Sequence, residues 1–121
     1  MTIAQAVEVV KAEPVVPAEE TESKLTGCFA SDLMSDVLAL ATPGSLLITG
    51  LTTDQTIRTA AIRHLAAVIV IEDKEISSDM REAAREEGIP LYRTPLSKYE
   101  ACALLMNAGL RPCRRQGTFT R

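Results

Sequence analysis

The middle of this sequence alternates short apolar runs with longer helix-forming runs, and this alternation limits the possible folds more than any other feature. The clearest apolar run, Ala67–Ile71, is continuous and rich in β-branched residues. Such a run is typical of a strand that is covered on both faces. Successive strands joined by helices need crossover connections, so the pattern predicts an α/β fold with a short, mostly parallel sheet and flanking helices.

Apolar runs and capping residues together predict where the other elements lie. Further strands are expected at residues 27–30, 46–49 and 89–92, and Val15–Val16 is expected to be a short extended piece. Thr52 with Gln55 and Ser97 with Glu100 have the spacing of a capping box. Helices are expected over residues 2–12, from 31 or 32 to about 41, from 52 to about 65, from 77 or 78 to 88, and from 97 to about 107.

Length and charge restrict the function. The chain has 121 residues, which predicts a single domain over residues 1–110 and a flexible basic tail over residues 111–121. The net charge is −3 and aromatic residues make up only 3%, so neither a basic field nor a stacking surface for nucleic acid is expected. No apolar run approaches the ~20 residues of a membrane span, and the N-terminus lacks a signal-peptide pattern. These features predict a cytoplasmic protein that binds neither nucleic acid nor membrane.

Residues that hold metals or form disulfides are sparse in the sequence. His64 is the single histidine, and the three cysteines, Cys28, Cys102 and Cys113, are widely spaced without a CxxC pair. Neither a zinc site nor a secreted disulfide framework is expected, and no cofactor is implied. Cys102 falls on the apolar stripe of its helix and is expected to lie in the core.

Polar residues follow three of the expected strands, and ligands collect at such strand ends in open α/β sheets. The free N–H groups of residues 52–54 can bind an anion such as phosphate, with Thr49, Gly50, Thr52, Thr53 and Thr94 as candidate contacts. The alternative is that residues 52–54 only cap their helix. The sequence contains neither GxGxxG nor GxxxxGK[ST], so phosphoryl transfer lacks its usual parts.

A second polar cluster, Ser31–Asp36, begins the helix that follows the strand at residues 27–30. Asp32 and Asp36 are one helical turn apart, and a pair of carboxylates on one face can perform acid–base chemistry or hold a divalent cation. Ser31 and Ser35 lie beside them in the sequence. The alternative is that these residues cap the helix and compensate its dipole.

The segment at residues 26–39, TGCFASDLMSDVLA, resembles the DRTGG domain family. Segments at residues 47–49, 65–69, 87–91 and 94–97 follow in the order expected for that family, and the resemblance covers about residues 2–110. Thr26 and Gly27 match the motif that gives the family its name. Cys28 replaces the second glycine of that motif, and Lys24 stands near the place of its arginine.

The resemblance implies a fold similar to that of the N-terminal domain of HPr kinase/phosphorylase. Family members occur alone and as modules beside CBS domains in regulatory pyrophosphatases, which implies a regulatory role. The separate P-loop domain of the kinase is absent from this sequence, so serine kinase activity is not expected.

These observations favour a non-catalytic regulatory or interaction module that binds a small anionic ligand or nucleotide, and they leave open a protein partner. The alternative is a small metal-assisted enzyme that uses Asp32 and Asp36 on a phosphorylated substrate. A homodimer is also expected, through Met34–Leu38 or Val15–Phe29, because several short apolar segments need a partner surface. The candidate ligand-binding residues are Ser31, Asp32, Ser35, Asp36, Thr49, Gly50, Thr52, Thr53 and Thr94.

Overall fold

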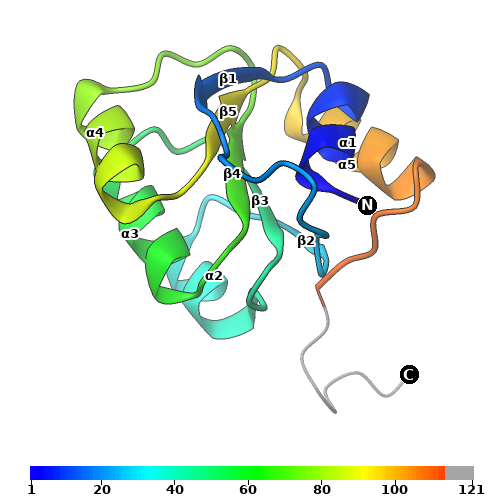
Figure 1. Cartoon of the computed structure of the whole chain (residues 1–121), viewed down its shortest axis with the longest axis horizontal. Helices are drawn as coiled ribbons and strands as arrows, with labels where there is room; N and C mark the ends of the chain where they lie inside the picture. The colour runs from blue at the N-terminus through cyan, green and yellow to red at the C-terminus, as the bar shows by residue number, and fades with distance from the viewer. Residues whose placement is uncertain (114–121) are drawn as a thin grey trace.

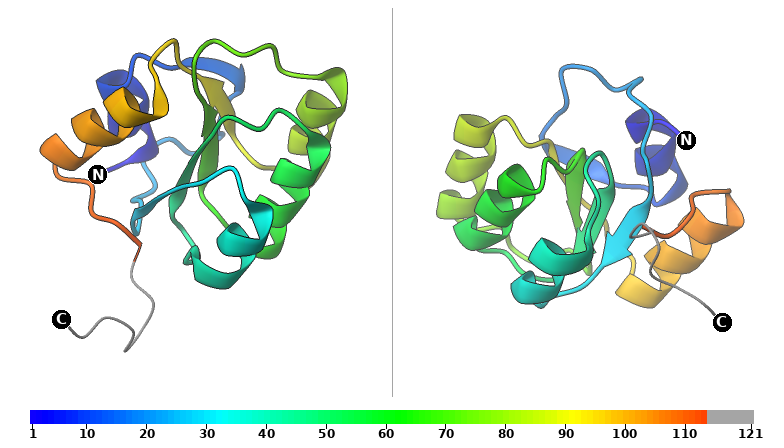
Figure 2. Two further views of the ribbon diagram at one scale, coloured as in Figure 1. Left: turned by 180° about the vertical axis from the view of Figure 1, so that it is seen from behind. Right: turned by 90° about the horizontal axis from the view of Figure 1, so that it is seen from below.

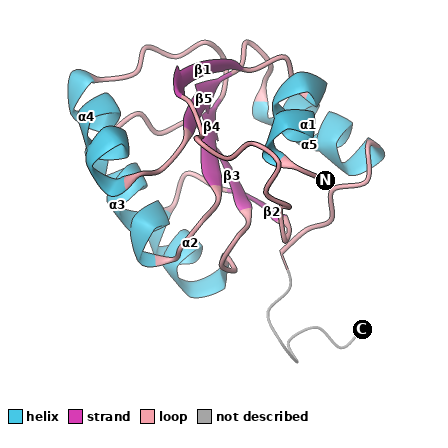
Figure 3. Cartoon of the chain, viewed as in Figure 1, coloured by secondary structure: helices cyan, strands magenta, loops and turns pink. Residues whose placement is uncertain are grey.

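The computed structural model describes residues 1–113, in which a five-stranded sheet lies between two layers of helices (Figures 1 and 3). Across the sheet the strands follow the order β1-β5-β4-β3-β2. The strands are β1 (Glu13–Val16), β2 (Cys28–Ala30), β3 (Leu46–Thr49), β4 (Ala67–Val70) and β5 (Leu91–Arg93). The helices are α1 (Ile3–Val9), α2 (Met34–Leu40), α3 (Asp54–Ile62), α4 (Ser78–Glu87) and α5 (Lys98–Asn107).

The sheet is mostly parallel, which confirms the predicted α/β class. Strands β2 to β5 run parallel to their neighbours, and α2, α3 and α4 form the crossovers between them. Because these strands are adjacent in sequence order and the crossovers share one hand, the three helices cover the same face. Helices α1 and α5 cover the other face (Figure 2). The extended piece predicted at Val15–Val16 belongs to β1, which adds antiparallel to β5.

The central strands β3 and β4 are buried along their whole length, as their continuous apolar sequences predict. Their side chains alternate between the two faces of the sheet. Leu47 and Val68 pack into the core beneath α2, α3 and α4, whereas Ile48 and Ile69 pack into the core beneath α1 and α5. Two separate apolar cores therefore meet at these two strands.

Four helix boundaries follow the predicted capping residues. Thr2 and Ser97 each form a capping box with the residue three positions later, at the starts of α1 and α5. The Ser77 hydroxyl caps α4 by accepting from the N–H of Met80 at 3.0 Å. Gly88 ends α4 in the left-handed conformation, with φ of 68°, where glycine carries no steric cost.

The predicted cap of α2 by Ser31 or Asp32 is wrong. Helix α2 begins at Met34, after Leu33, and no side chain caps it. The Ser31 hydroxyl instead accepts from the N–H of Leu33 at 3.0 Å, and the Asp32 carboxylate is turned toward the end of β3. Local side-chain bonding before the helix therefore replaces the predicted cap.

Both predicted ends of α3 also differ from the structure. The helix begins after Thr53, which is still extended, and its N-terminus has no side-chain cap, so Thr52 does not form the predicted capping box. It ends at Ile62 rather than near residue 65. His64 has a left-handed conformation with φ of 55°, which stops the helix and turns the chain toward β4.

Both edges of the sheet are protected against pairing with another strand. Pro14 lies in the edge strand β1 and lacks an N–H to donate. At the other edge, the N–H of Cys28 donates to the carbonyl of Arg111 at 2.9 Å, and the N–H of Cys113 donates to the carbonyl of Cys28 at 3.0 Å. The first residues of the predicted basic tail therefore lie along β2.

The remainder of that predicted tail, residues 114–121, lies outside the described residues. Over residues 1–113, no helix combines the length and the apolar character that crossing a membrane requires.

Thr94 is a buried structural link, so we expect its replacement by valine to destabilise the protein. Its hydroxyl donates to the Val10 carbonyl at 2.6 Å and accepts from the Leu96 N–H at 3.2 Å. Thr94→Val removes both bonds and leaves buried groups without partners, which costs about 1–3 kcal/mol of unfolding free energy. Chemical denaturation measures the loss. Thr52→Val, at a position that forms no cap, is expected to stay within about 0.5 kcal/mol of the parent.

Candidate functional site

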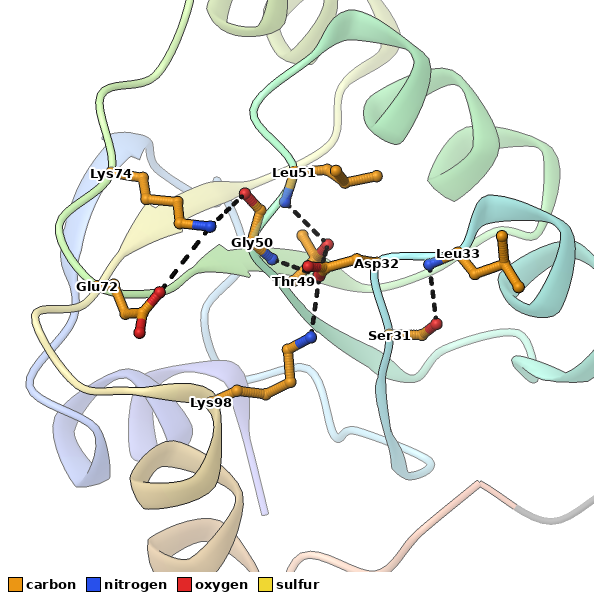
Figure 4. Close-up of polar contacts among 9 residues, drawn as sticks. All are labelled: Ser31, Asp32, Leu33, Thr49, Gly50, Leu51, Glu72, Lys74 and Lys98. Atoms are coloured by element: carbon orange, nitrogen blue, oxygen red, sulfur yellow. Dashed lines mark hydrogen bonds and ion pairs between the residues drawn. The ribbon is translucent and has the colours of Figure 1, made fainter.

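Asp32 lies two residues after β2 and turns its carboxylate toward the end of the neighbouring strand β3 (Figure 4). Its Oδ1 atom accepts from the Gly50 N–H at 2.7 Å and from the Thr49 hydroxyl at 3.0 Å. The Lys98 Nζ atom donates to the same oxygen at 3.0 Å. Lys98 is the first residue of α5. One carboxylate oxygen therefore connects the segment after β2, the end of β3 and the start of α5, at the carboxyl ends of the parallel strands.

Gly50 leaves space at this point for two charged side chains. A β-carbon at position 50 would lie 2.8 Å from Lys74 Nζ and 3.2 Å from Asp32 Oδ2. The Lys74 Nζ atom donates to the Gly50 carbonyl at 3.3 Å and lies 3.9 Å from Glu72 Oε1. The missing side chain thus lets a cation and a carboxylate approach the same short stretch of backbone.

Lys74 reaches Gly50 because the chain turns sharply after β4. Glu72 and Asp73 both adopt left-handed conformations, with φ of 60° and 50°. Their N–H groups donate to backbone carbonyls in the segment after β5, at 2.8 and 2.9 Å. The turn is held at both residues, and it also places Asp73 Oδ1 3.9 Å from Arg93 Nε.

The surroundings of Asp32 favour its charged form. Partial burial raises the pKa of the carboxyl group, but the Gly50 N–H, Lys98 and the Thr49 hydroxyl together hold it below its ordinary value of 3.8. The ionised carboxylate is therefore the form that the folded chain stabilises. It fills the position at the strand end where a bound anion would accept the same hydrogen bonds.

The structure brings together three of the predicted ligand residues, Asp32, Thr49 and Gly50. Thr94 lies elsewhere in the core, with its hydroxyl already bonded to the Val10 carbonyl. The remaining predicted residues flank the starts of two helices: Ser31, Ser35 and Asp36 at α2, and Thr52 and Thr53 at α3.

Lys74 and Lys98 complete the cluster, and neither was among the predicted site residues. The available signals were weak. Lys98 directly follows the capping residue Ser97, and Lys74 follows Glu72 and Asp73, the polar residues after β4. Because a lysine side chain is long and exposed, its sequence position alone does not indicate which backbone segment its ammonium group will reach.

The two carboxylates of the enzyme hypothesis point to different surroundings. Asp36 lies in the exposed first turn of α2, whereas Asp32 precedes the helix and faces Gly50. Within residues 1–113 no group of three or more His, Cys, Asp or Glu side chains is arranged to hold a metal ion. The geometry therefore gives no support to Asp32 and Asp36 as a shared cation site.

Three cationic side chains, Lys74, Lys98 and Arg93, end at the carboxyl edge of the sheet. Each faces an acidic side chain, at distances of 3.9, 3.0 and 3.9 Å. All these side chains are more than a third exposed. Exposed ion pairs contribute little free energy, so an added anion can compete for these cations at a modest cost.

Cys28 and Cys102 line a small apolar cavity of about 160 Å³ between β2 and α5. Burial, together with nearby Cys102 and Cys113, raises the pKa of Cys28 to about 12. Burial also raises the pKa of Cys102, against the opposing effect of Lys98. Both thiols therefore stay neutral and serve as packing groups rather than nucleophiles.

The fold has a clear counterpart among solved structures. The chain resembles the regulatory region of a Clostridium perfringens pyrophosphatase, containing CBS and DRTGG domains, which was solved with its activator diadenosine tetraphosphate. The TM-score is 0.75 at 15% sequence identity, and the match covers 98% of this chain and 53% of the other. The chain thus spans about half the length of that regulatory region. No protein family and no curated protein matches the sequence.

We expect Asp32→Asn to weaken the fold at neutral pH and to have no effect in strong acid. Because the folded-state pKa of Asp32 is lowered, its ionised form stabilises the protein above pH 3.8, and this stabilisation disappears as the pH falls through the lower folded-state value. The side chain is partly exposed, so the loss at pH 7 is at most about 1 kcal/mol.

Urea unfolding at pH 7 and at a pH below both values measures this difference. Asp36→Asn is the matched control, since it removes the same charge from the exposed first turn of α2. A destabilisation by Asp32→Asn that stays equal at both pH values would contradict the assigned role of the charge.

Proposed function

We propose that this chain is a non-catalytic regulatory module of the DRTGG type, which binds a small anionic ligand at the carboxyl edge of its sheet. The observation that carries the proposal is the cluster at Gly50, where Lys74 donates to the Gly50 carbonyl and Lys98 pairs with the neighbouring Asp32 carboxylate. The ligand contacts the two ammonium groups and takes Lys98 from Asp32.

The Lys98–Asp32 contact offers a simple way to sense such a ligand. In the ligand-free chain this ion pair ties the start of α5 to the end of β3 through Asp32. A phosphate group carries more charge than a carboxylate and competes for Lys98. Ligand binding therefore changes how α5 is held, and α5 covers one face of the sheet (Figure 2).

A phosphate-bearing ligand, such as a nucleotide, fits the available chemistry. The cations of the Gly50 cluster are the lysine side chains of Lys74 and Lys98, and lysine is a usual partner of phosphate. The similar pyrophosphatase region was solved with diadenosine tetraphosphate, which supports the same ligand class for this chain. No observation specifically favours the alternative of a metal-assisted enzyme.

We also propose that the chain forms a homodimer through α2 and the end of α3. Leu33, Leu38 and Ile62 are exposed by 58%, 42% and 65%, and α2 packs beside α3. Two interfaces were expected from the sequence, Met34–Leu38 and Val15–Phe29. The proposed interface contains the first, because Val15 and Phe29 pack against the core. An isologous pair would cover this apolar surface.

Anion binding at Gly50 predicts opposite effects from the two halves of the ion pair. Lys98→Gln is expected to weaken binding of ATP or diadenosine tetraphosphate by about tenfold, the value of one lost charge-assisted hydrogen bond. Asp32→Asn is expected to strengthen binding, because it removes the competing carboxylate. Isothermal titration calorimetry on folded protein measures both effects.

Lys24→Gln is the control for these titrations, because Lys24 lines a cavity with Gly44 and Pro90, which precede β3 and β5 at the opposite end of the sheet. Unchanged affinity in both Lys98→Gln and Asp32→Asn would remove Gly50 from the ligand site. The absence of heat with every nucleotide tested would argue against a nucleotide ligand altogether.

Light scattering tests the proposed dimer. We expect a mass near twice 13.1 kDa at micromolar concentration for the parent chain, and a mass near 13.1 kDa for Leu38→Glu, which places a charge in the apolar interface. Leu104→Glu is the matched control, since Leu104 is 41% exposed on α5 at the other face. A parent mass of one chain that does not change with concentration would rule out the dimer.

A further inference from the structure

A cavity of about 600 Å³ lies between the end of β5 and the start of α4, apart from the cluster at Gly50. Its volume falls within the range of small-molecule sites, roughly 300–1,000 Å³. None of the residues that form it was among the predicted ligand residues. They are Glu75, Ile76, Ser77, Ser78, Arg81 and Arg93.

Two arginines from different elements face this cavity. Leu91 packs into the core beneath α4, and Arg93, two residues later in β5, projects to the same face of the sheet. Arg81 lies one turn into α4, above the capping residue Ser77. Both arginines are half-buried and line the cavity, and an arginine in such a place commonly packs its apolar stem and leaves its guanidinium group in water.

The charges around the cavity leave these guanidinium groups able to accept an oxyanion. Within residues 1–113 Arg81 forms no ion pair, and Arg93 has one long contact of 3.9 Å with the exposed carboxylate of Asp73. Glu75 is the one acidic residue on the cavity wall. The Ser77 hydroxyl is already committed to the Thr52 carbonyl at 2.8 Å, so recognition rests on the two arginines.

We propose that this cavity is a second anion site, which binds the phosphate end of a small phosphorylated molecule between Arg81 and Arg93. A guanidinium group presents paired donors that match the oxygens of phosphate. One guanidinium group comes from helix α4 and the other from strand β5, so the two can contact different oxygens of one phosphate. The cavity is larger than the phosphate group needs, so its remaining volume accepts the rest of the molecule. The site does not depend on Lys98 or Asp32.

Inorganic pyrophosphate is the probe for this site, titrated at constant ionic strength into the Lys74→Gln, Lys98→Gln double variant. That background removes both ammonium groups of the Gly50 cluster. Adding Arg81→Gln or Arg93→Gln is expected to weaken the remaining pyrophosphate binding by about tenfold each, as expected for one charge-assisted contact. Calorimetry gives the affinity, and circular dichroism checks that each variant is folded.

Arg85→Gln is the matched control, because Arg85 lies on the same helix but faces the cavity at the other end of the molecule. The proposal requires this control to bind as the double variant does. It is overturned if the double variant binds no pyrophosphate, or if Arg85→Gln weakens binding as much as Arg81→Gln. If the double variant binds no pyrophosphate, the Gly50 cluster is the anion site. If the double variant still binds pyrophosphate and Arg81→Gln weakens that binding, the Arg81–Arg93 cavity is a separate anion site.

Discussion

The burial of β3 and β4 on both faces is the constraint on which the rest of this structure depends. These strands carry apolar side chains toward both layers, so neither face can be left in contact with water. The crossover helices cover one face, and the other face is covered by α1 and α5 from the two ends of the described chain (Figure 2). The polar residues that follow the strands must then gather where the strands leave the sheet, and the ion pairs of Lys74, Lys98 and Arg93 are found there.

Local patterns predicted most of the fold because they have local physical causes. The β-branched run Ala67–Ile71 and the capping residues of α1, α4 and α5 act within a few residues of themselves. The failures at α2 and α3 have different origins, a tertiary contact at α2 and a local backbone conformation at α3. Asp32 is drawn away from its helix by a strand that lies close in space, and His64 ends α3 by its backbone conformation. Neither influence can be read from helix propensity.

The sequence predicted where in the fold the candidate site lies, but not all of the residues that form it. Parallel strands place their carboxyl ends together, which is why Asp32, Thr49 and Gly50 meet as residues that follow adjacent strands. The basic side chains were missed because two of them, Lys98 and Arg81, come from helices whose placement over the sheet is a property of the whole fold. Thr94 was predicted as a ligand residue, but its hydroxyl donates to the Val10 carbonyl and so links the end of β5 to the segment after α1.

The pairing at the two sheet edges has a consequence for how the chain folds during synthesis. β1 pairs with β5, nearly eighty residues later in the sequence, and Cys28 pairs with Pro112. The middle strands can assemble as they leave the ribosome, but neither edge closes until the last of these segments has emerged. Contacts so distant in sequence slow folding. During that interval β1 has no partner strand, and the open edges of β2 and β4 are the parts of the sheet most exposed to wrong pairing.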